Sequence, residues 1–233
     1  MKIFPIKAFS DNYIWLVEDN ETLIIVDPGE SNGVLDYLQQ KKFNKRTILL
    51  THNHEDHVGG VIDILENYPG TAVYGPSETQ HLNTMTLKEK DYFEIDGHTF
   101  SVLKTNGHTK EHISYLTDNA LFCGDALFSA GCGRVFTGDY QAMFETMKKF
   151  RQLQNDVKIY AGHEYTVTNL AFAHARKPDN LQIRDALREA QELREKNLPT
   201  LPSTIGKEKQ MNLFLQAESL EKFIRLREAK DDF

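Results

Sequence analysis

Three histidines and two acidic residues stand within six positions of the segment ILLTHNHEDHVGG (residues 48–60). Four of these side chains, His52, His54, Asp56 and His57, directly follow an apolar run that is typical of a buried strand. Neutral imidazole and carboxylate groups are the ligands that suit zinc and similar divalent metals. A single histidine here would indicate only a polar surface loop, but the pattern H-x-H-x-D-H at the end of a strand predicts a metal-binding loop.

Three further potential ligands stand alone in the chain, and each lies beside a glycine after apolar residues. His108 occurs in TNGHT, Asp125 in LFCGDALF and His163 in IYAGHEYT. Four ligands from one loop cannot complete two metal sites, so a larger site needs side chains from other segments. The recurrence of strand, glycine and ligand therefore predicts that these three residues complete the ligand set.

The elements that must position these side chains alternate between short strands and helices up to about residue 160. This order predicts an α/β domain in which two sheets are layered between helices. Beyond residue 165 the sequence instead predicts charged amphipathic helices, and it contains no flexible linker. We therefore expect a catalytic domain over residues 1–165 and a helical domain over residues 166–233 that packs onto it. The predicted helices cover residues 34–42, 60–68, 140–153, 181–197 and 217–233.

The charge and composition of the chain exclude several classes of protein. Its 233 residues carry 27 basic and 34 acidic side chains, and the net charge of −7 is poorly suited to binding nucleic acid through its phosphates. The N-terminal segment lacks the apolar core of a signal peptide, and no apolar run is long enough to span a membrane. Cys123 and Cys132 have no disulfide framework around them, so reduced thiols are expected. These features predict a cytoplasmic protein with neither a nucleic acid nor a membrane as its partner.

The motifs THNHEDH, GHT, GD and GHEYT, in this order and spacing, resemble those of the metallo-β-lactamase superfamily. Within that superfamily the chain resembles the glyoxalase II family of hydroxyacylglutathione hydrolases. The resemblance covers nearly the whole chain, and the segments GCGRVFTG (131–138) and LREAKDDF (226–233) single out this family. It implies a four-layer αββα sandwich followed by a C-terminal helical domain.

The same resemblance implies a site with two metal ions. The first ion would take His52, His54 and His108. The second ion would take Asp56, His57 and His163, and Asp125 would bridge both ions together with a water or hydroxide. Zinc is the expected metal, and iron and manganese accept the same ligands. The implied reaction hydrolyses S-D-lactoylglutathione to glutathione and D-lactate, in methylglyoxal detoxification, by attack of the bridging hydroxide on the thioester. Asp56 and Asp125 are the expected catalytic carboxylates.

The resemblance also implies a cationic and hydroxylic pocket for the two carboxylates of glutathione. Judged only by their spacing on the last helix, two of the implied residues would indicate a solvated surface. The chain departs from many relatives at Phe136, where they have tyrosine, and at Gln216, where they often have arginine. Both departures are expected to affect affinity and not the reaction. The implied substrate-binding residues are Arg134, Tyr165, Asn169, Arg227 and Lys230.

Asp27, in VDPG at a strand end, has two interpretations of equal weight. Its carboxylate could accept a hydrogen bond from a ligand histidine or from metal-bound water, or it could simply begin the Pro-Gly turn. His112 lies near the metals in sequence but is expected outside the ligand set, because seven residues already fill it. The other histidines, His81, His98 and His174, are predicted to be surface residues.

Three alternatives remain open at this point. The first is another hydrolase of the superfamily, such as a lactonase, a β-lactamase or a tRNA-processing nuclease; the acidic charge and the missing signal peptide disfavour the last two. The second is a glutathione-linked sulfur dioxygenase with one iron, which would not need the complete second site or the glutathione-binding tail. The third is a non-catalytic binding module that has lost its metals, which should show broken ligands. No long apolar stripe is left exposed, so a monomer is expected.

Overall fold

The histidine-rich segment begins just after strand β4 (Lys45–Leu49), so its first ligands lie in the loop at the carboxyl end of that strand. The computed structural model describes residues 1–233, and these residues form two compact units. Four of the predicted ligands belong to unit 1 and three belong to unit 2. The two units are, in order, residues 1–104 with 111–118, and residues 105–110 with 119–233.

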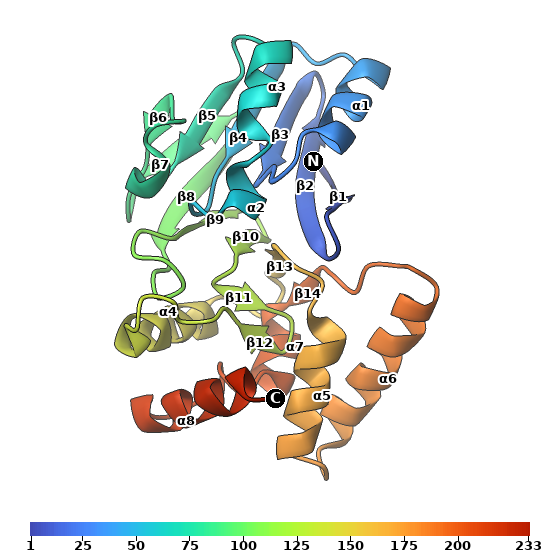
Figure 1. The fold of residues 1–233 in the computed structure, drawn as a ribbon, viewed down its shortest axis with the longest axis vertical. Helices are drawn as coiled ribbons and strands as arrows, with labels where there is room; N and C mark the ends of the chain where they lie inside the picture. The colour runs from blue at the N-terminus through green and yellow to red at the C-terminus, as the bar shows by residue number, and fades with distance from the viewer. The chain divides into compact units, whose positions relative to one another are not determined.

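Unit 1 contains a six-stranded sheet that is mixed in direction (Figure 1). Its first three strands are antiparallel, and from the third strand onward neighbouring strands are parallel. Parallel neighbours need long connections, and α1 (Asn32–Gln40) and α3 (Val61–Asn67) supply two of them. In the order of the sheet, the strands are β1 (Lys2–Ala8), β2 (Asn12–Asp19), β3 (Thr22–Val26), β4, β5 (Ala72–Gly75) and β6 (Met85–Thr86).

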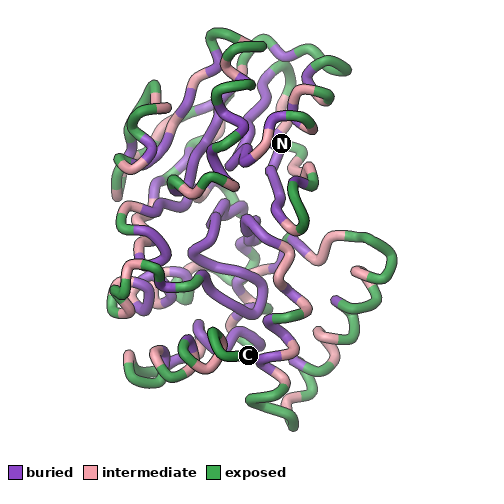
Figure 2. Tube along the Cα trace, viewed as in Figure 1, coloured by how far each residue is buried: buried purple, intermediate pink, exposed green.

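The core of unit 1 explains why the sequences of its central strands are continuous apolar runs. Successive side chains of a strand point to opposite faces, and both faces of β3 are buried along its length. One face packs on apolar side chains of α1 and α3, among them Leu38 and Ile64. Figure 2 shows these strands as buried, whereas the outward turns of the helices are exposed. This packing fixes the end of β4, from which the ligand loop departs.

Three antiparallel strands of unit 1 lie against the other face of that sheet: β7 (Tyr92–Ile95), β8 (His98–Lys104) and β9 (Ile113–Thr117). The buried Tyr115 hydroxyl on β9 donates to the carbonyl oxygen of Leu50 at 2.7 Å and also lies 3.2 Å from that of Tyr74. The backbone N–H of Ile113 donates to the carbonyl oxygen of Thr51 at 2.9 Å. The two residues that precede His52 are therefore held from β9.

Unit 2 carries its predicted ligands after strand ends as well. Strand β10 (Ala120–Gly124) runs parallel to β13 (Lys158–Ala161), and β14 (Ser203–Thr204) pairs antiparallel with β13. Asp125 directly follows β10, and His163 follows β13 after one glycine. A short hairpin connects β11 (Leu127–Phe128) to β12 (Gly131–Cys132).

The helices of unit 2 include three that the sequence pattern predicts and two that it does not. The pattern misses α5, which opens with β-branched residues, and α7, which is short and contains a glycine; neither has a strong apolar period. Residues 119–165 belong to the same compact unit as the C-terminal helices. The boundary between the two compact units therefore does not fall at residue 165. The five helices are α4 (Tyr140–Gln152), α5 (Thr166–Arg176), α6 (Leu181–Glu195), α7 (Ile205–Met211) and α8 (Leu220–Asp231).

Candidate metal centre and substrate cavity

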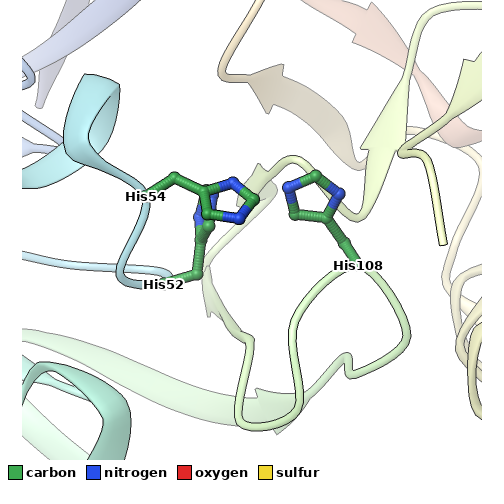
Figure 3. Close-up of side chains that lie close together, drawn as sticks. All are labelled: His52, His54 and His108. Atoms are coloured by element: carbon green, nitrogen blue, oxygen red, sulfur yellow. The ribbon is translucent and has the colours of Figure 1, made fainter. Parts of the chain in front are cut away.

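The four predicted ligands of unit 1 lie on one short segment. His52 and His54 stand in the loop after β4, as Figure 3 shows, and His54 is the N-cap residue of α2 (Glu55–Val58). Asp56 and His57 lie on α2 itself. The ring centroid of His52 is 4.7 Å from that of His54 and 4.1 Å from that of His57. Protonated imidazoles would repel each other at these separations, so the cluster suits neutral rings that share a cation.

Hydrogen bonds to Asp27 orient this cluster. Its carboxylate accepts the backbone N–H of Thr51 at 2.8 Å and the Thr51 hydroxyl at 2.7 Å, and Nδ1 of His57 lies 3.1 Å from the same group. The Thr51 hydroxyl also lies 3.0 Å from Nδ1 of His52. Since a carboxylate only accepts and the hydroxyl proton goes to Asp27, both histidines donate through Nδ1. Each therefore keeps the lone pair on Nε2, the atom that can bind a metal.

Three neighbours complete the surroundings of the unit 1 ligands, and the sequence pattern does not single out two of them. The Asn12 amide donates to the Asp56 carboxylate at 2.9 Å. A Cβ on Gly29 would lie 1.8 Å from the carbonyl oxygen of Asp56, so only glycine allows this close approach. The fully buried ring of His112 stacks on His52 with centroids 4.9 Å apart, and this contact gives it a packing role.

The three predicted ligands of unit 2 meet at one carboxylate oxygen. Oδ2 of Asp125 lies 3.5 Å from Nε2 of His108 and 3.3 Å from Nε2 of His163. Ligand atoms placed tetrahedrally at about 2.1 Å from a zinc ion are about 3.4 Å from one another. All three side chains are at least nine-tenths buried. The spacing and the donor atoms therefore fit a metal ion.

The backbone around β12 fixes the orientation of His108, whose loop follows β8 (Figure 3). Nδ1 of His108 lies 2.9 Å from the carbonyl oxygen of Arg134, and a carbonyl only accepts, so this ring also keeps its lone pair on Nε2. A Cβ on Gly133 would lie 2.9 Å from Nδ1 of His108 and 2.0 Å from the carbonyl oxygen of Asp125. Only a glycine at residue 133 leaves room for both ligands.

A cavity of about 460 Å³ in unit 2 contains all five predicted substrate-binding residues. It also contains His108 and Asp125, so potential metal ligands and cationic side chains face one space. The ring of Tyr165 stacks on His163 at 4.7 Å. A volume of this size suits a small organic molecule. The cavity is lined by His108, Asp125, Phe128, Cys132, Arg134, Phe136, Tyr165, Thr168, Asn169, Arg227, Lys230 and Asp231.

Comparison with known proteins places this geometry in a family. The metallo-beta-lactamase superfamily model matches residues 9–85 and 82–163, and the model of the hydroxyacylglutathione hydrolase C-terminus matches residues 164–233. A hydroxyacylglutathione hydrolase of Glaesserella parasuis serovar 5 is 48% identical over 234 residues, which cover 100% of both chains. The chain belongs to the hydroxyacylglutathione hydrolase family. A relative with the same name from Haemophilus ducreyi is 44% identical, again over 100% of both chains.

Solved structures agree with the fold of this family. ETHE1 from Myxococcus xanthus superposes with a TM-score of 0.74 at 22% identity, covering 98% of this chain and 90% of that one. The BLEG-1 B3 metallo-beta-lactamase gives a TM-score of 0.69 at 22% identity, covering 93% and 99%. The predicted metallo-β-lactamase fold with a C-terminal helical part is thus confirmed. No helix is both long and apolar enough to cross a bilayer.

The hydroxyacylglutathione hydrolase resemblance pairs Arg227 with Lys230, but the structure gives them different surroundings. Arg227 is buried, donates to the carbonyl oxygen of Cys132 at 2.9 Å and pairs with Asp231 at 3.0 Å. The Lys230 ammonium instead lies over the ring of Phe172 at 5.6 Å. Burial, and next the charge of Arg227, lower the pKa of Lys230 below that of an ordinary lysine. The pair is therefore not the solvated surface that spacing alone indicates.

The two departures from the hydroxyacylglutathione hydrolase pattern lie in different places. Phe136 lines the cavity, with its ring edge-on to His108 at 5.3 Å and beneath the Arg134 guanidinium at 6.0 Å. Gln216 does not line this cavity; its side chain accepts a hydrogen bond from Lys177 at 2.7 Å beside a separate hollow. Gln216 therefore makes no contribution to the lining of this cavity, and its effect on glutathione affinity stays a prediction.

The remaining histidines are only partly at the surface. His81 is exposed, as predicted. His98 is only one-quarter exposed and bridges Asp19, at 2.6 Å, and Asp118, at 3.3 Å. His174 is half-buried on α5. The surface prediction was wrong for His98, because the carboxylates of Asp19, at the end of β2, and Asp118, in a turn, close around it.

Proposed function

We propose that this hydroxyacylglutathione hydrolase family member cleaves S-D-lactoylglutathione to D-lactate and glutathione, the second step of methylglyoxal detoxification. The observation that carries the proposal is the unit 2 cavity, where Asp125 and His108 face the same space as Arg134 and Lys230. A substrate whose thioester reaches Asp125 would have its glutathione carboxylates within the cationic part of the same cavity. The full-length relatives that share the name support this substrate class.

We also propose that seven residues hold two divalent cations, with zinc as the metal. Three imidazoles that keep their lone pair on Nε2, together with buried carboxylate oxygens, are the donors that such ions take. When bound, two cations lower the pKa of a water between them towards neutrality and so supply a hydroxide nucleophile. The proposed ligands are His52, His54 and His108 for one ion, Asp56, His57 and His163 for the other, and Asp125 for both.

The residues of the chain have three tasks in this reaction. Asp27 holds the His57 ring in the orientation that ligation needs. Arg134 and Lys230 bind and orient the carboxylates of the tripeptide, and Tyr165 and Asn169 add polar groups. The leaving thiol has a pKa of about 8.5, so it departs as a thiolate without a strong general acid. The water-derived oxygen adds to the acyl carbon, and the bond between that carbon and sulfur then breaks, with its electron pair leaving on the sulfur.

Residues 1–165 would then form the metal-binding catalytic domain, and residues 166–233 would form the domain that binds glutathione. The helical part supplies Asn169, Arg227 and Lys230 to the cavity. We propose that the enzyme acts as a monomer in the cytoplasm. Its net charge of −7 supports a partner other than nucleic acid.

Metal analysis combined with a thioester assay tests this function. Purified protein should contain close to two transition-metal ions and should release glutathione from S-D-lactoylglutathione. A protein that stays active at one ion when metal is supplied would refute the two-metal proposal. Oxygen consumption with glutathione persulfide, in place of thioester hydrolysis, would favour the sulfur dioxygenase alternative.

A further inference from the structure

A fully buried carboxylate lies in unit 2 outside the substrate cavity. Glu208, on α7, has no exposed surface. One of its oxygens accepts the hydroxyls of Ser203, at 2.6 Å, and Ser129, at 3.1 Å. The other accepts the backbone N–H of Ala130, at 2.7 Å, and the Asn212 amide, at 3.2 Å. An ionised carboxylate can accept about four hydrogen bonds, so these four donors fill all acceptor positions of Glu208.

Two of these partners belong to the turn of the β11–β12 hairpin, residues 127–132. Ala130 has a φ of +55°, a left-handed conformation that costs energy for a residue other than glycine. The Asn212 amide lies 3.3 Å from the carbonyl oxygen of Phe128 and 3.0 Å from that of Gly131. The hairpin itself has only two residues in each strand. Side chains of α7 and its C-cap therefore hold a turn that its own backbone pairing cannot hold alone.

The hairpin in turn contacts residues of the substrate cavity. The Asn169 amide donates to the carbonyl oxygen of Ser129 at 3.1 Å, and the Arg227 guanidinium donates to that of Cys132 at 2.9 Å. Phe128 and Cys132 line the cavity directly. Glu208 does not line it. The contacts of Glu208 with Ser129 and Ala130 therefore connect it to the cavity through the hairpin.

We infer that Glu208 and Asn212 anchor the hairpin 127–132 and thereby position Asn169 and Arg227 for the glutathione part of the substrate. Glu208 is thus a positioning residue and not a catalytic one. The functional consequence rests on the proposed function, because it concerns the glutathione part of the cavity. The anchoring itself rests only on contacts within unit 2.

Three variants separate this role from simple stabilisation. Glu208→Leu removes all four acceptor interactions. Glu208→Gln can keep them, because its oxygen can accept from Ala130 and Asn212 while its amide donates to the two serine hydroxyls. Ile205→Ala is the matched control, since it opens a buried position on the same helix, where the backbone N–H bonds to Val157 and not to the hairpin. Ser129→Ala removes a single donor and serves if Glu208→Leu does not fold.

Two measurements on the metal-loaded full chain decide the inference. In Glu208→Leu, amide hydrogen exchange over residues 127–132 should accelerate, and KM for S-D-lactoylglutathione should rise about tenfold with kcat within about threefold. Glu208→Gln should restore both values, Ile205→Ala should leave the KM unchanged, and Ser129→Ala should raise the KM about threefold. The inference is overturned if either the hydrogen exchange or the KM is unchanged in Glu208→Leu. If Glu208→Leu does not fold, the same two outcomes in Ser129→Ala overturn it. If the wild type cleaves no glutathione thioester, the proposed function fails, and hydrogen exchange alone decides the anchor.

Discussion

Nδ1 of His57 lies 3.1 Å from a carboxylate oxygen of Asp27, and both side chains are almost completely buried. Asp27 also accepts two hydrogen bonds from Thr51, so its carboxylate cannot turn away without losing both. These contacts combine both interpretations of Asp27: the residue stands at a turn, and its carboxylate lies within hydrogen-bond distance of a predicted ligand histidine. Its φ of +52° is tolerated because the carboxylate is held at three points.

Asp27→Ala should weaken metal binding without removing a ligand. Losing the partner of a ligating histidine typically costs about 10- to 100-fold in metal affinity. Metal retained by the purified variant at increasing concentrations of a competing chelator measures the effect. Asp36→Ala, an exposed position on α1, is the control. Equal retention by Asp27→Ala and the wild type would mean that Asp27 only shapes the turn.

Asp125→Ala should abolish hydrolysis and lower the metal content. The Asp125 oxygen is the point at which His108 and His163 meet, so its removal takes negative charge from between the proposed cations. His108→Ala should deplete one ion and His163→Ala the other. Metal content by elemental analysis and kcat for S-D-lactoylglutathione check this. Full turnover in Asp125→Ala would exclude a metal centre at this residue.

Lys230→Ala should raise KM for glutathione thioesters and leave kcat nearly unchanged. The contact is remote from the breaking bond, so it contributes equally to ground-state and transition-state binding. A hydrogen bond to a charged group is worth about 1.5–3 kcal/mol, which corresponds to a rise in KM of about ten- to over a hundredfold. Lys222→Ala, an exposed cation on the same helix outside this cavity, is the matched control. A small thioester without the tripeptide should show no difference between the variants.

The KM for glutathione thioesters should rise with pH, and the rise should begin at a lower pH than it would if Lys230 had the pKa of an ordinary lysine. Burial lowers the pKa of Lys230, so its ammonium loses its proton at a lower pH and its attraction for a carboxylate is lost there. Lys230→Arg remains charged, so its KM should rise less than that of the wild type over the same alkaline range. Both enzymes meet the same ionisations of the substrate, so their KM ratio isolates residue 230. A constant ratio would place the titrating group elsewhere.

Phe136→Tyr should improve binding. Phe136 lines the substrate cavity and is 63% exposed, so the added hydroxyl of a tyrosine is expected to face the cavity or solvent. One neutral hydrogen bond contributes about 0.5–1.5 kcal/mol, which lowers KM about two- to tenfold. Phe9→Tyr, exposed on unit 1, is the control and should leave KM unchanged. A KM that does not fall in Phe136→Tyr would show that the departure from tyrosine has no effect on affinity.

Sequence patterns alone predicted the candidate ligands and most of the main elements, because both have local signatures. H-x-H-x-D-H after an apolar run and lone ligands beside glycines are visible in the order of residues. The helices α4 and α6 are clearly amphipathic, α8 is rich in charged residues, and all three lie within their predicted ranges. The family resemblance, confirmed by the full-length relatives, extended these signals to the fold and the substrate class.

Only the tertiary structure decided which polar groups meet. Thr51 and Asn12 carry no motif, yet they orient His52 and Asp56 through hydrogen bonds. Gln216 was assigned to glutathione affinity from its sequence position, yet it lies beside another hollow. Glu208 is buried against a hairpin that lies nearly 80 residues earlier in the chain, and no sequence pattern around Glu208 predicts this contact. Local patterns reflect what one segment needs for burial or ligation, whereas hydrogen-bond partners distant in the chain are selected only when the core closes around them.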